Sequence, residues 1–95
     1  MPLCFYIHIN IQTTDGPQPI GRFELGADRS FANNLFKQLK GSTEVNLRDM
    51  LYIEFIEVVN GLPLNIDVLT CDLQELGTNT MLITQELFRM ANLKG

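Results

Sequence analysis

Apolar and polar residues alternate along the first part of the chain, and this alternation predicts β-strands. The clearest case is Leu3–Thr13, where every odd position from Leu3 to Ile11 is apolar and the residues between them form the other face. A period of two over that length is typical of a half-buried strand. The segment 20–25 alternates again after a Thr-Asp-Gly-Pro-Gln-Pro cluster, whose residues are typical of a turn. The two segments predict a pair of neighbouring strands.

A second hairpin is predicted around Asn60-Gly61, because a two-residue Asn-Gly turn is the strongest short-range hairpin signal. The flanking segments 51–59 and 64–71 are rich in β-branched and aromatic residues. A helix over 47–60 is the rival interpretation, since the same apolar residues also fit a helical stripe. In a regular hairpin, odd positions of the first strand face even positions of the second. One face would then carry Leu51, Ile53, Phe55, Val59, Leu64, Ile66 and Val68.

Two regions have a helical period. After Asp28, a good N-cap residue, an apolar stripe precedes the stop signal Gly41 and consists of Phe31, Ala32, Leu35, Phe36 and Leu39. Residues 42–49 form a connector that could hold a helical turn. From Asp72 onward the period is helical again, with Gly77-Thr78-Asn79 as an interruption. The pattern allows either one kinked helix or two separate helices there.

These elements predict one α+β domain over 1–95, with the order β-β-α-β-β-α and a possible further helix. The expected architecture is a two-layer sandwich, in which a mainly antiparallel four-stranded sheet carries helices on one face. The strand order cannot be derived from the pattern.

Charge narrows the range of partners. The formal net charge is −4 and the pI is about 4.7, and the whole acidic excess lies in residues 51–95. Because phosphate binding needs a basic surface, we expect no nucleic-acid partner. No leader segment and no apolar run of membrane-spanning length is visible, so we expect no membrane contact. Two distant cysteines without metal-ligand spacing indicate reduced thiols in the cytoplasm, and neither a metal nor a cofactor is expected.

Three residues are candidates for catalysis. Cys71 lies where a strand should end and a helix begin, which can lower a thiol pKa, and His8 is the single histidine that could serve as its base. Both are expected to point away from the main apolar face. A structural cysteine is the plainer interpretation. Glu57 falls on the predicted apolar face, where burial would raise its pKa and suit it to acid–base work, unless the hairpin end or a bulge exposes it.

The opposite sheet face is the candidate partner surface. It is expected to carry one group of large side chains, namely Tyr6, Tyr52, Ile56, Val58 and Leu69. Glu54 and Asp67 are expected on the same face, opposite or diagonal to each other, without the spacing of a Ca²⁺ or Zn²⁺ site. A plain solvent-facing surface is the alternative.

The sequence thus favours a small non-enzymatic, cytoplasmic module for protein–protein interaction, with a homodimer among the expected forms. One alternative is a small thiol-dependent enzyme that uses Cys71 with His8. Another is an acidic regulator that binds a basic partner.

Overall fold

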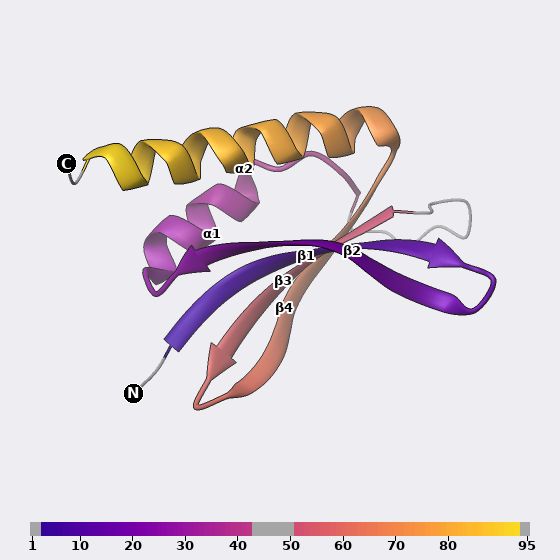
Figure 1. Cartoon of the computed structure of the whole chain (residues 1–95), viewed down its shortest axis with the longest axis horizontal. Coiled ribbons are helices and arrows are strands. Elements are labelled where there is room, and N and C mark those ends of the chain that lie inside the picture. Colours follow the sequence, from indigo (N-terminus) through magenta and orange to yellow (C-terminus); the bar gives the residue numbers. More distant parts are fainter. Residues whose placement is uncertain (1–2, 43–50, 94–95) are drawn as a thin grey trace.

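The sheet is built from two hairpins whose first strands lie side by side. The computed structural model describes residues 3–42 and 51–93. Its elements follow the order β1 (Leu3–Thr13), β2 (Gly16–Gly26), α1 (Arg29–Lys37), β3 (Leu51–Val59), β4 (Leu62–Cys71) and α2 (Leu73–Leu93). The strand order is β2-β1-β3-β4, every neighbouring pair is antiparallel, and both helices lie on one side of the sheet (Figure 1). This arrangement confirms the predicted α+β class and order.

Tight turns close both hairpins. Asn60 and Gly61 have φ values of 54° and 80°, and the flanking Val59 and Leu62 pair directly, as a two-residue Asn-Gly turn requires. β3 is therefore a strand, and the rival helix is wrong for residues 51–59. In the first hairpin Thr13 pairs with Gly16, so β2 begins four residues earlier than predicted. Its two prolines are tolerated because β2 is an edge strand.

A β-bulge at Ile66 inverts the faces of the second half of β4. Phe55 pairs with Asp67 while Ile56 pairs with Asn65, which leaves Ile66 as the extra residue. Beyond the bulge Leu69 pairs with Ile53, on the face that the helices cover. The face predicted for Leu69, Asp67, Val68 and Cys71 is therefore wrong, because one extra residue reverses the alternation for the rest of the strand.

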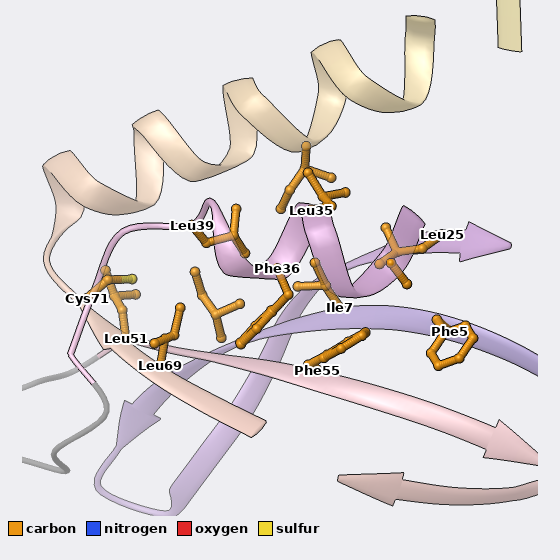
Figure 2. Packing of buried hydrophobic residues seen from close by; sticks show 13 residues of the cluster. Phe5, Ile7, Leu25, Leu35, Phe36, Leu39, Leu51, Phe55, Leu69 and Cys71 are labelled. Carbon is orange, nitrogen blue, oxygen red and sulfur yellow. The ribbon is translucent and has the colours of Figure 1, made fainter. Parts of the chain in front are cut away.

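The core fills the space between the helices and the sheet. Phe36 of α1 stacks on Phe55 of β3 with ring centroids 4.9 Å apart, and Phe5 lies 5.9 Å from Phe55 on the other side. Figure 2 shows the side chains of Leu69 and Cys71 among the core residues on the helix side of the sheet, with Leu35 directed toward α2. The core therefore holds the two β4 residues that were predicted to point away from it.

The side chain of Asp28 caps α1 by accepting a hydrogen bond from the Phe31 amide at 3.1 Å, and the helix ends at Lys37, before the predicted stop. A reciprocal pair begins α2, in which Asp72 accepts from the Glu75 amide and Glu75 accepts from the Asp72 amide.

The second helix is continuous from Leu73 to Leu93, so the interruption predicted at Gly77-Thr78-Asn79 is wrong. Asn79 is completely buried and binds the backbone of Lys40 twice: its Oδ1 accepts from the Lys40 amide and its Nδ2 donates to the Lys40 carbonyl, each at 2.7 Å. This contact fastens the helix to the segment that follows α1. Ser42 pairs with Thr70 at the start of the predicted connector, and the rest of that connector lies outside the described residues.

Candidate binding site on the open sheet face

The face of the sheet away from the helices contains a hollow of about 310 Å³. Each of the four strands contributes to its lining, which consists of Asn10, Gln12, Pro17, Tyr52, Glu54 and Val68. The register explains why these side chains meet: Asn10 pairs with Tyr52, Gln12 with Pro17, and Glu54 with Val68. Because paired residues project on the same side of a sheet, the pairing of the strands brings these side chains together around the hollow.

Glu54 is the charged group of the hollow, and two neutral amides hold its carboxylate. Asn10 donates from Nδ2 to Oε1, and Asn65 donates from Nδ2 to Oε2 at 2.7 Å. The ion pairs found among the described residues are Arg22–Glu24, Arg29–Glu57 and Arg89–Glu86, so Glu54 has no cationic partner there. A carboxylate has about four acceptor positions, and the two amides leave both oxygens able to accept again.

The bulge removes a second carboxylate from this site. In the predicted register Asp67 would lie opposite Glu54, but Val68 takes that position and Asp67 pairs with Phe55 on the other face. The expected pairing of Glu54 and Asp67 is therefore wrong. The hollow therefore holds one carboxylate, that of Glu54. Its cross-strand neighbour Val68 is apolar, and Tyr52 belongs to the same lining.

The predicted partner patch on this face is only partly assembled. Tyr6 and Ile56 are cross-strand neighbours, yet each is only 7% exposed. The guanidinium of Arg22 lies 4.0 Å from the centre of the Tyr6 ring, and the His8 ring lies 4.7 Å from it. Val58 and Tyr52 are half-buried at opposite ends of β3, whereas Leu69 belongs to the core.

Cys71 and His8 cannot meet as a nucleophile and its base. Cys71 is 3% exposed and lies in the core on the helix side of the sheet, whereas His8 pairs with Glu54 and Arg22 on the open side. The strand β3 also separates the two strands that carry them. Cys71 was placed on the wrong face because the prediction lacked the bulge.

Glu57 is bound in an ion pair. Arg29 at the start of α1 donates to both of its carboxylate oxygens, at 2.8 and 3.0 Å. The hydrogen bonds from Arg29 hold the pKa of Glu57 below its usual range, and Glu57 in turn raises the pKa of Arg29. The predicted rise in the pKa of Glu57, which would have suited it to acid–base catalysis, is therefore wrong.

Sequence reasoning placed some lining residues on this face but did not identify them as a site. Alternation placed Asn10, Tyr52 and Glu54 on the open face, but the proximity of Asn10 to Glu54 depends on the pairing of β1 with β3, which the pattern could not predict. Pro17 was assigned to a turn, and Val68 to the core. The signal that could have found the site is the group of amide side chains around one acidic position in the central strands.

Comparisons with protein-family models, curated proteins and solved structures found no match to this chain. The described part of the chain contains no cluster of three or more His, Cys, Asp or Glu side chains that could hold a metal ion. Neither helix, over the residues described, combines the length and the hydropathy needed to cross a membrane. The fold and the geometry of the open face are therefore the basis for any functional argument.

Proposed function

We propose that this chain is a non-enzymatic protein-interaction module that holds a basic side chain of a partner protein against the open face of its sheet. The observation that carries the proposal is the Glu54 carboxylate, oriented by two amides inside a hollow and lacking a cation among the described residues. The cytoplasmic location expected from the sequence remains a prediction.

An arginine side chain fits the chemistry of the hollow. Its planar guanidinium donates two parallel hydrogen bonds to a carboxylate and stacks on aromatic rings, for which Glu54 and Tyr52 supply the acceptor and the ring. Because Asn10 and Asn65 already hold the carboxylate in place, binding would cost little additional side-chain entropy. The net charge of −4 would also speed the approach of a basic partner.

A second copy of the chain is a poorer occupant of this face than a different protein. The arginine that the described open face carries is Arg22, which is bound to Glu24 at 2.9 Å and lies over Tyr6. Two copies meeting through this face would place uncompensated Glu54 charges on the same interface without a cation to pair with them. The proposal thus combines the interaction module and the acidic binder of basic partners that the sequence suggested.

A titration of the protein with a capped Gly-Arg-Gly tripeptide, followed in two-dimensional ¹H–¹⁵N spectra, tests the proposal. We expect shift changes centred on Asn10, Tyr52, Glu54 and Val68, which weaken as salt is added because the contact is partly ionic. Gly-citrulline-Gly, which has the same shape without the charge, should bind at least about tenfold more weakly, a difference of about 1.4 kcal/mol.

Two variants distinguish binding in the hollow from a general attraction of the peptide to an acidic protein. Glu54→Gln should bind the Gly-Arg-Gly tripeptide at least about tenfold more weakly than the wild type. Glu24→Gln removes a carboxylate of the same face that is already paired with Arg22, so it should bind the tripeptide as the wild type does. Thermal unfolding of each variant controls for stability. Shift changes scattered over the surface, or equal affinities of Glu54→Gln and the wild type, would contradict the proposal.

A further inference from the structure

The outer side of α2 exposes large apolar residues along its length. Leu73, Met81 and Phe88 are 78%, 62% and 69% exposed, whereas Ile83 on the inner side is completely buried. Successive spacings of eight and seven residues keep the three on one side of an α-helix. The helix lies farther from the sheet than α1 does, so this side faces away from the rest of the described chain (Figure 1).

The same side of the helix carries no charged residue. At 100° per residue, Glu75, Glu86 and Arg89 all fall outside it. Its members are all neutral: Leu73, Gly77, Met81, Thr84, Phe88 and Ala91. Exposed polar residues lie beside this strip of the helix, namely Gln74, Thr78, Gln85 and Asn92. Charged and polar residues normally cover the wet side of an amphipathic helix, so an uncharged strip with three large exposed apolar side chains indicates a surface that is covered in use.

Gly77 gives an independent indication that another helix approaches here. It lies inside α2 without a positive φ, and a Cβ atom added to it would meet nothing within 4 Å. Glycine weakens a helix relative to alanine, and nothing in the described part of the fold requires it at this position. A neighbouring backbone that packs closely against the helix would require it, because the distance between packed helices depends on side-chain size at the contact.

We propose that two copies of this chain pair through the outer sides of their α2 helices, antiparallel, about a two-fold axis at the middle of the helix near Leu82 and Ile83. In this register Phe88 lies on the partner's Gly77 and Met81 on the partner's Thr84. Leu73 comes within one residue of the partner's Ala91. Each large side chain meets a small one, and the two-fold axis makes every contact twice. Because this strip is neutral, the contact itself brings no like charges together.

The size of the contact sets the expected affinity. A helix of 21 residues is about 30 Å long at 1.5 Å per residue. Two such helices in contact bury about 1,000 Å² in total, at the low end of specific interfaces. The dimer should therefore dissociate at micromolar concentrations. The apolar residues Leu62, Leu64 and Ile66 on the edge strand β4 fit self-association less well, because Pro63 and the bulge disrupt that edge.

Sedimentation equilibrium from about 1 to 500 μM tests the pairing. We expect the mass to rise with concentration from 10.8 kDa toward twice that value. Phe88→Glu should remain a monomer throughout, whereas Ile20→Glu, which places the same charge at an exposed apolar residue of β2, should dimerise as the wild type does. A wild type that stays monomeric to 500 μM, or equal effects of the two substitutions, would overturn the proposal.

Gly77→Ala distinguishes a role of Gly77 in the contact between helices from an effect on the fold of the monomer. The substitution should weaken the dimer but stabilise the monomer. The monomer should unfold at a higher temperature when diluted below the dissociation constant, since alanine favours the helix. The dimer should dissociate at least about tenfold more readily, since the added methyl group separates the helices. An unchanged dissociation constant in Gly77→Ala, with the expected gain in monomer stability, would overturn the close contact at this residue.

A paramagnetic experiment tests the orientation. An unlabelled Cys4→Ser copy carries a nitroxide at Asn92→Cys, an exposed position beside the strip of contact residues, and is mixed with a ¹⁵N-labelled copy. Antiparallel pairing should broaden the amide signals of Leu73 and Gln74 in the labelled copy. Broadening around Ala91 instead would indicate parallel helices and overturn the proposed axis.

Discussion

Replacing Asn79 by alanine should remove a large part of the stability of the fold. The side chain makes two hydrogen bonds of 2.7 Å to the backbone of Lys40, and it is completely buried. Alanine would lose both bonds and leave the amide and carbonyl of Lys40 without these partners, at a cost of about 2–4 kcal/mol. A 95-residue domain has about 5–14 kcal/mol in total, so the unfolding temperature should fall by roughly 10 °C or more.

Urea denaturation followed by circular dichroism measures this cost, with the variant and the wild type extrapolated to water. Asn92→Ala is the matched control: it removes an asparagine from the same helix, but one that is exposed and donates only to the Phe88 carbonyl at 2.8 Å. We expect the control to cost less than about 0.5 kcal/mol. Equal losses in the two variants, or less than about 1 kcal/mol for Asn79→Ala, would refute the view that α2 is fastened through Lys40.

Three further predictions follow from the core and the ion pair. Because Arg29 lowers the pKa of Glu57, the stabilising contribution of this ion pair is present above the usual carboxylate pKa and is lost as the pH falls through the lowered pKa. In acid-titrated melts, the stability difference between the wild type and Glu57→Gln should therefore shrink as the pH falls and close below that lowered pKa. A thiol reagent should modify Cys4 rapidly and Cys71 only on unfolding, since Cys4 is exposed and Cys71 is buried; equal rates would contradict the described core. Phe55→Ala should cost about 3–5 kcal/mol in urea unfolding, and a loss under 1 kcal/mol would mean that its ring is not packed as described.

Local patterns were enough to predict the elements and their order. Alternation in Leu3–Thr13 and the Asn60-Gly61 turn identified the central strands, because both depend on neighbours along the chain. The continuity of α2 could not be predicted in this way. Gly77 is a local signal for interruption, but the burial of Ile83 and the contact between Asn79 and Lys40, which are 39 residues apart, outweigh it.

The bulge at Ile66 was equally invisible in the alternation, since β4 has apolar residues on both faces. Leu64 and Ile66 suit the regular register, whereas Leu69 and Cys71 suit the bulged one. The position of the helices decides between them. Leu69 and Cys71 are buried beneath the helices, while Ile66 is 45% exposed, so the extra residue occurs where little apolar burial is lost.

The same bulge determines the chemistry of the open face. A regular β4 would place Asp67 opposite Glu54, and two neighbouring carboxylates raise one another's pKa and favour a shared proton or a cation. With the extra residue, Val68 takes that place, and the neutral amides of Asn10 and Asn65 hold a single carboxylate. The register that completes the core therefore also produces the lone, oriented charge on which the proposed binding of a basic partner depends.

The two surfaces that we propose for binding are compatible because they lie on opposite sides of the molecule. The hollow is on the open face of the sheet, and the outer side of α2 is beyond α1 on the other (Figure 1). Pairing through α2 would leave both hollows uncovered and directed away from the two-fold axis. A partner with two basic segments could then bind both hollows, and its affinity would exceed that for one hollow only where its linker spans the dimer. Dimerisation would thus add avidity to a site that binds a single side chain weakly.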